Sequence, residues 1–196
     1  MMRISFPTAL LGAGLFLGGC RRSKTPEPAL QLPPATAVGA NTLGFQVDGR
    51  VWTTYGQTCV FSGPCRDNTL SARVDRGPGG LLRLLVSTQL TTPQYAEDFL
   101  LQVDSVQGPG SYRCAPRFTG LISPVPTGFA LQDNKTTGGT PTQRLALSTA
   151  ATGRIMLTQV DTVRRVMAGT FEGQLRQTGA PHATRELTQG RFDIRY

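Results

Sequence analysis

The sequence predicts an all-β fold, a single antiparallel β-sandwich or barrel-like domain of about eight strands over residues 41–196. Three observations support this prediction. Apolar side chains recur at every second position after residue 41, and no long stretch shows the 3.6-residue period of a helix. Turn residues such as Gly, Pro and Asp separate the apolar runs, as in sandwiches and barrels.

Residues 1–19 have the pattern of a signal peptide. Arg3 precedes an apolar run from Ile4 to Leu17, and Gly18 and Gly19 lead to Cys20. The run is shorter than the roughly 20 apolar residues that cross a bilayer and contains Pro7, so we expect no permanent span. We expect a helix over about residues 4–18, detached from the domain.

The sequence LGGC at residues 17–20 resembles the bacterial lipobox, whose cysteine is acylated and becomes the first mature residue. An ordinary secretory signal with an incidental cysteine is the alternative. The resemblance implies a diacylglycerol on Cys20, and two acyl chains make a stable membrane anchor. The chain is therefore expected to be a lipoprotein of the cell envelope.

Residues 20–40 are expected to form the lipidated cysteine and a Pro-rich tether. Pro26, Pro28, Pro33 and Pro34 oppose a helix and favour polyproline II. Fully extended, this stretch would hold the domain on the order of 60 Å from the membrane. Its basic residues either rest on anionic lipid headgroups or are simply solvated; they are Arg21, Arg22 and Lys24.

Residues 45–52, FQVDGRVW, predict the clearest hairpin. Asp-Gly between two alternating strands favours a type I′ turn, because both central residues need positive φ. This register pairs Val47 with Arg50 and Phe45 with Trp52. We expect Phe45, Val47 and Trp52 to share a core-facing side, with Trp52 packed on Phe45.

Further strands are expected along the chain. Residues 81–87 form a nearly continuous apolar run that predicts burial on both faces, and residues 99–103 alternate. Prolines and glycines between residues 115 and 142 predict long loops with room for one strand. The remaining predicted strands lie at residues 70–74, near Tyr112, and at residues 145–147, 155–160, 167–175 and 192–196.

The last strand alternates apolar and charged residues. Phe192, Ile194 and Tyr196 alternate with Arg191, Asp193 and Arg195, which predicts a half-buried strand with one charged face. This strand is expected to tie the C-terminus into the sheet.

Three cysteines remain after Cys20. Cys59 and Cys65 bracket a short Gly-Pro loop and are the first choice for a disulfide in an exported protein, with Cys114 as the alternative partner of either. No metal site and no cofactor are expected. The cysteines lack close ligand spacing, and the single histidine, His182, lies in a Gly-Ala-Pro-His loop.

The net charge of +8 is spread along the chain rather than gathered in a block. Nucleic-acid binding is therefore not expected. Envelope glycans or anionic lipid headgroups are the partners that this charge permits.

Several motifs resemble one family. Residues 32–36 read LPPAT, residues 39–45 read GANTLGF, residues 47–52 read VDGRVW and residues 107–112 read QGPGSY. The chain then reads AGTFE at residues 168–172 and ends in GRFDIRY at residues 190–196. These motifs resemble small uncharacterised lipoproteins of the Bacteroidota, a family that implies no activity and no catalytic residues.

The resemblance also bears on location, which is expected to be the outer membrane. Surface lipoproteins of that group often carry acidic residues just after the cysteine, whereas this chain carries Arg21 and Arg22. The periplasmic face is therefore at least as well supported as the cell surface. The stretch from Cys59 to Cys65 is not part of the family pattern.

Catalytic sets are sparse in the sequence. His182 has no evident partners for a Ser-His-Asp arrangement. Glu97 and Asp98 are adjacent, so they point to opposite faces of a strand, and hydrolysis would need a distant partner such as Asp48, Asp104 or Glu172. We expect a non-enzymatic binding or structural domain.

Two alternatives stay open. A carbohydrate-binding module would present a flat exposed aromatic strip, for which Tyr55 is the freest candidate because it lies opposite Trp52. A glycan-active hydrolase would bring two dispersed carboxylates together in a cleft.

Overall fold

The structure is a computed structural model of the chain. It describes residues 26–59, 63–114, 127–134, 136–137, 140–141, 152–176 and 183–196. Four sequence predictions lie outside these residues: the helix over residues 4–18, Cys20, the strand at residues 145–147 and His182.

The larger sheet is fully antiparallel and has six strands, in the order β2-β1-β14-β13-β12-β8. The last strand in the chain, β14, therefore lies in the middle of the sheet between β1 and β13. The strands are β1 (Thr42–Val47), β2 (Arg50–Thr53), β8 (Gly110–Arg113), β12 (Arg154–Asp161), β13 (Val166–Arg176) and β14 (Thr184–Arg195).

The second sheet has four antiparallel strands in the order β5-β6-β7-β9. It consists of β5 (Ser71–Arg76), β6 (Leu82–Thr91), β7 (Ala96–Val106) and β9 (Gly128–Asp133), with the 3₁₀ turn η1 (Pro78–Gly80) between β5 and β6. Two small hairpins pair β3 (Gln57–Thr58) with β4 (Arg66–Asp67) and β10 (Thr136–Thr137) with β11 (Thr140–Pro141).

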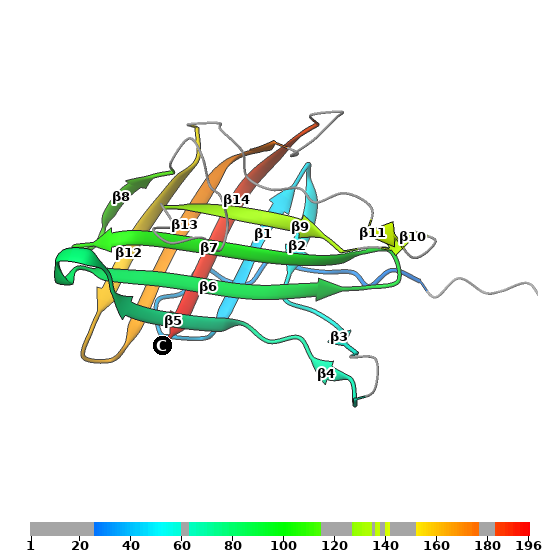
Figure 1. The fold of residues 1–196 in the computed structure, drawn as a ribbon, viewed down its shortest axis with the longest axis horizontal. Coiled ribbons are helices and arrows are strands. Elements are labelled where there is room, and N and C mark those ends of the chain that lie inside the picture. Colours follow the sequence, from blue (N-terminus) through cyan, green and yellow to red (C-terminus); the bar gives the residue numbers. More distant parts are fainter. Residues whose placement is uncertain are drawn as a thin grey trace, which may run out of the picture.

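The two large sheets stack face to face as an open sandwich. Figure 1 shows β6 and β7 crossing in front of β13 and β14 at a steep angle. The predicted antiparallel all-β class is confirmed, in its sandwich form. The described residues form more strands than the eight expected. The region predicted to hold long loops contains β9 as well as the β10–β11 hairpin, and the sequence pattern does not reveal the two-residue strands of the small hairpins.

The predicted hairpin is confirmed in register. Phe45 pairs with Trp52 and Val47 with Arg50, and the turn residues Asp48 and Gly49 have φ of 49° and 79°. Both turn residues thus adopt the positive φ that a type I′ turn requires.

Aromatic rings from both sheets meet in the core. The Phe45 ring lies 4.8 Å from the Trp52 ring and 4.6 Å from the Phe99 ring, centroid to centroid. Phe99 in turn stacks on Phe171 at 5.4 Å. The predicted inward face of β1 and β2 is therefore confirmed, since Phe45, Val47 and Trp52 are all buried.

The prediction that the run at residues 81–87 is buried on both faces is wrong. Leu84 and Val86 of β6 are fully buried, but Leu85 is only half-buried and Ser87 is exposed. The strand packs on one side alone, because no strand or helix of the described residues forms a third layer over the opposite face of the four-stranded sheet.

The expected charged face of the C-terminal strand is corrected at one position. Phe192 and Ile194 are buried in the core as predicted, but Asp193 on the opposite face is also buried, at 1% exposure. Its carboxylate accepts hydrogen bonds from the Thr36 hydroxyl at 2.6 Å and from the Val38 and Gly39 amides at 2.9 and 2.6 Å.

These bonds come from residues 26–40, which we call the N-terminal segment. The structure contradicts the expected free tether, because Leu30 packs against the core and Arg191 donates to the Pro33 carbonyl at 3.4 Å. Pro33 also touches Gly44, where any Cβ would collide with the proline ring. The segment lies on the outer face of the six-stranded sheet, so the folded unit begins before residue 41.

Candidate functional site

Tyr55, the predicted ligand-contact aromatic, is 45% exposed. It forms an isolated parallel bridge with Leu90, and its carbonyl accepts a hydrogen bond from the Asn68 side chain at 2.7 Å. The other described aromatic side chains are buried or half-buried. Within the described residues, Tyr55 is therefore not part of an exposed aromatic strip of the kind that a carbohydrate-binding module was expected to show.

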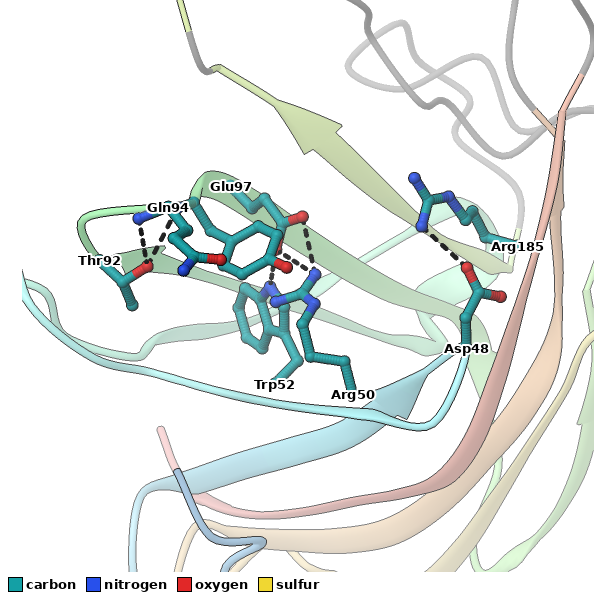
Figure 2. A network of polar contacts seen from close by, with 8 residues as sticks. Asp48, Arg50, Trp52, Thr92, Gln94, Glu97 and Arg185 are labelled. Carbon is teal, nitrogen blue, oxygen red and sulfur yellow. Dashed lines mark hydrogen bonds and ion pairs between the residues drawn. The ribbon is translucent and has the colours of Figure 1, made fainter. Parts of the chain in front are cut away.

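A buried polar cluster joins the two sheets near β2 and β7. Arg50 Nη2 lies 2.8 Å from both carboxylate oxygens of Glu97, and Trp52 Nε1 donates to Glu97 Oε2 at 2.9 Å. The Tyr95 ring covers the guanidinium, with its centroid 3.9 Å from Arg50 Cζ. Figure 2 shows Arg50 and Trp52 reaching from the β1–β2 hairpin toward Glu97 on the overlying strand.

This cluster has the character of a structural contact. Glu97 is 6% exposed and its oxygens are already bound by Arg50 and Trp52, which leaves little room for a substrate. A buried charge without a partner is strongly unfavourable, and Arg50 Nη2 supplies that partner for Glu97, whereas Arg50 Nη1 is buried without a hydrogen-bond partner among the described residues. Sequence reasoning assigned Trp52 to Phe45 correctly but missed Glu97 as its hydrogen-bond acceptor.

Other acids considered for hydrolysis are also held by protein donors. Asp48 accepts hydrogen bonds from Arg185 Nη1 at 2.8 Å and from the Glu186 amide at 2.9 Å. The first of these contacts is drawn in Figure 2. Asp98 accepts a hydrogen bond from the Asn134 side chain at 2.6 Å. These environments resemble those of structural carboxylates, whose acceptor oxygens are used within the fold.

The cysteines separate into two environments. The structure joins Cys59 and Cys65 in a disulfide beside the β3–β4 hairpin. Cys114 is a free, buried thiol, and burial raises its pKa to about 12. The alternative pairing with Cys114 is therefore not formed.

A concavity lies on the outer face of the six-stranded sheet. It has a volume of about 500 Å³, within the range of small-molecule pockets. We call it the outer hollow. Its floor and walls come from alternate positions of three neighbouring strands: Arg154 and Met156 of β12, Thr170 and Glu172 of β13, and Gln189 and Arg191 of β14.

Sheet register explains why these side chains gather. Met156 pairs with Thr170 and Thr170 pairs with Arg191, so the three form one row across β12, β13 and β14. Arg154 pairs with Glu172 in the next row. Residues two apart on a strand share a face, so both rows point outward while Ile155 and Phe171 point into the core.

A β-bulge shapes the edge of the outer hollow. The pairing of β14 with both neighbours shifts around Gln189, which has a φ of 54°. Such a conformation is unfavourable for a residue other than glycine, and bulges often redirect a side chain beside a binding site. Ala35 of the N-terminal segment, Phe171 and Gly190 complete the lining.

The outer hollow carries uncompensated positive charge. Arg154 forms an exposed ion pair with Glu172 at 3.2 Å. The hydrogen bonds of Arg191 in the described structure go to the carbonyls of Gln189 and Pro33, at 3.3 and 3.4 Å, rather than to a carboxylate. Sequence reasoning missed this site, because its residues come from strands whose order the sequence does not reveal.

Three comparisons bear on the identity of the chain. Searches against protein-family models, curated proteins and solved structures each find no match. No helix among the described residues is long and apolar enough to cross a membrane. In that same part of the chain, no group of three or more His, Cys, Asp or Glu side chains has the arrangement of a metal site.

Proposed function

We propose that this protein is a lipid-anchored lipoprotein of the bacterial envelope whose β-sandwich is a non-enzymatic binding domain. The outer hollow is its binding site. The observation that carries the proposal is the gathering of Arg154, Gln189 and Arg191 around an accessible concavity on one sheet face. The polar groups in the core, by contrast, are engaged in holding the two sheets together.

The anchor part of the proposal is based on the sequence. A basic start, a short apolar run and Gly18-Gly19-Cys20 stand in the order of a lipoprotein signal. Lipid on Cys20 would hold the domain at the outer membrane, on its periplasmic face or at the cell surface. The resemblance to Bacteroidota lipoproteins points to the same location.

The anchor is tested by growing cells with an alkyne-tagged palmitate and detecting the label on the protein. Wild-type protein is expected to carry label and to sediment with membranes, whereas Cys20→Ser carries none. Cys114→Ser is the matched control and keeps the label. An unlabelled wild-type protein in the soluble fraction would contradict the proposal.

The binding part is tested with a panel of envelope glycans and anionic lipids, using thermal unfolding of the purified protein as the readout. A ligand of the folded state raises the unfolding temperature by mass action. The shift is expected to disappear when the outer hollow is blocked by Thr170→Trp. If no member of the panel raises the unfolding temperature, the domain has a purely structural role.

A further inference from the structure

The geometry points to an anionic glycan, a sugar chain bearing carboxylate or phosphate groups, as the ligand of the outer hollow. This inference rests on the proposed function and specifies the chemistry of its site. Three features support this ligand: the charge balance around the outer hollow, the groups between the charges and the shape of the surface.

The charge balance around the outer hollow is positive. Arg113 on β8 pairs directly with Arg154 on β12, and both side chains lie on the outer face. Like charges directly opposite each other in a sheet are unfavourable. The outer hollow itself is lined by Arg154, Arg191 and one carboxylate, Glu172, and Arg113 lies beside it on β8.

Asp193, another acid on this face, offers no compensation. The carboxylate of Asp193 is buried beneath the N-terminal segment and is bound by Thr36, Val38 and Gly39. Arg191 Nε and Nη1 donate to the Gln189 and Pro33 carbonyls, and Nη2, which makes no hydrogen bond among the described residues, is available for an incoming oxyanion. Arginine matches carboxylate and phosphate groups with two parallel hydrogen bonds.

The spacing of the cations suits an extended ligand. Arg154 and Arg191 lie two strands and two residues apart, so their Cα atoms are separated by about 12 Å. Their long side chains can hold one anionic group together or two groups on successive sugars. A single small inorganic anion would use only part of this arrangement.

The groups between the arginines fit a sugar better than a bare anion. Thr170 offers a hydroxyl and Gln189 an amide, both of which bond with sugar hydroxyl groups. Met156, half-buried in the row beside Thr170, presents an apolar side chain to the ring face of a sugar. Polar groups around a small apolar floor are typical of ligand sites.

The surface favours a glycan over a membrane. Membrane docking uses apolar side chains that insert beside the cations. The exposed large apolar residues of the described structure are Val38, Tyr55 and Val163, and none of them lines the outer hollow. The site is a depression, which a chain can enter and a flat bilayer cannot fill.

The test uses the full-length protein in a neutral polyoxyethylene detergent, titrated calorimetrically with four probes. These are tetragalacturonate, a phosphorylated tetramannose, neutral maltotetraose and glycerophosphoglycerol, the soluble headgroup of phosphatidylglycerol. At least one acidic saccharide is expected to bind ten or more times tighter than maltotetraose. Arg191→Gln and Arg154→Gln are each expected to weaken that binding about tenfold, the loss of one charge-assisted contact.

Arg73→Gln is the matched control. Arg73 is exposed on β5 of the other sheet, so this variant removes the same charge away from the outer hollow and should change the affinity less than twofold. An equal loss in the control would show attraction by net charge and overturn the inference. The two acidic saccharides distinguish a carboxylate from a phosphate ligand, and binding of either supports the inference.

The remaining outcomes separate the inference from the proposed function. Tight binding of maltotetraose that Thr170→Trp abolishes would overturn the anionic ligand but keep the binding domain. Binding of glycerophosphoglycerol without either acidic saccharide would replace the glycan with an anionic lipid headgroup and overturn the inference. No binding of any probe by the folded protein would overturn both.

Discussion

The molecule contains two arginine–glutamate pairs that differ in almost every physical respect. Arg50 and Glu97 meet at 2.8 Å, with 27% and 7% of their side chains exposed, and connect the two sheets. Arg154 and Glu172 meet at 3.2 Å on one sheet face, with 56% and 61% exposed. The charged groups of the first pair are mostly surrounded by protein. Those of the second pair are exposed to water, so Arg154 can exchange Glu172 for a ligand.

The difference teaches where stability and where binding reside. A buried pair is costly to break because one charge is left without solvent or partner. An exposed pair contributes on the order of 0–1 kcal/mol, so its members can be drawn to a ligand at little expense to the fold. An arginine–glutamate pair thus stabilises the contact between the two sheets in one place and is available for ligand binding on the surface in the other.

The sharpest test of this contrast removes each glutamate. Glu97→Ala is expected to lower the free energy of unfolding by about 4 kcal/mol, because the half-buried Arg50 loses its counter-charge and the buried Trp52 loses its hydrogen-bond acceptor. Glu172→Ala is expected to cost less than about 0.5 kcal/mol. Urea unfolding followed by circular dichroism measures both, and similar losses would contradict the contrast.

A charge-free version of the buried pair refines the interpretation. In Arg50→Met/Glu97→Met both charges are absent, so the double variant should be more stable than Glu97→Ala. If the double variant is instead the less stable of the two, packing and the Trp52 hydrogen bond dominate rather than charge.

Asp193 provides the next largest effect, as a buried acid on the sheet face that otherwise faces water. Asp193→Asn is expected to cost about 3 kcal/mol at pH 7, because the bonds to Thr36 and to two amides lose their charged acceptor. Burial on its own would raise the pKa of this carboxyl, but these hydrogen bonds outweigh burial and lower the pKa.

The sign of the pH dependence follows from that shift. A lowered folded-state pKa gives stability that is present above the unfolded value of about 3.9 and is lost as the pH falls through the folded value. Wild-type protein should therefore lose more stability in acid than Asp193→Asn does. Chemical unfolding between pH 3 and pH 7 measures this, and parallel profiles would refute it.

Gln189 should show a smaller effect of opposite sign. Glycine adopts positive φ without strain, so Gln189→Gly is expected to raise the free energy of unfolding by about 1 kcal/mol. The same variant is expected to weaken the binding of the acidic glycan, because the Gln189 amide is lost. Ser105→Gly is the control, because Ser105 also has positive φ, 55°, but lies outside the outer hollow. Weaker glycan binding in both variants would argue against a role for Gln189.

The smallest expected effect is a gain of affinity. Glu172→Gln removes the carboxylate that competes for Arg154 and should tighten acidic-glycan binding about threefold, roughly 0.6 kcal/mol. Calorimetry at low salt detects this change, and 0.5 M salt should reduce it by screening. No change at low salt would place Arg154 outside the binding contact.

Much of the fold could be predicted from the chain, because alternation and turn chemistry are local. The Asp48-Gly49 sequence predicts a hairpin with a two-residue turn, and this turn length sets the pairing of Phe45 with Trp52. The inward side of β13 follows from the same period, since Met167, Phe171 and Leu175 are all buried as expected. No long-range information was needed for either.

The candidate site could not be predicted because it depends on strand order. Arg154 and Arg191 are far apart in the sequence and meet only because β13 lies between their strands. The burial of Asp193 was missed for a related reason. Alternation predicts which side of a strand a residue occupies, but not that a proline-rich segment from the other end of the chain covers that side.

The packed N-terminal segment has a consequence for distance from the bilayer. If Cys20 carries lipid as proposed, the residues between Cys20 and Leu30 span only about 30 Å when fully extended. This is half the distance that a free tether reaching to residue 40 would span. The sandwich would then stay close to the headgroup layer. The domain would then bind ligands only in a thin zone above the bilayer, and inserting residues into the tether would widen that zone.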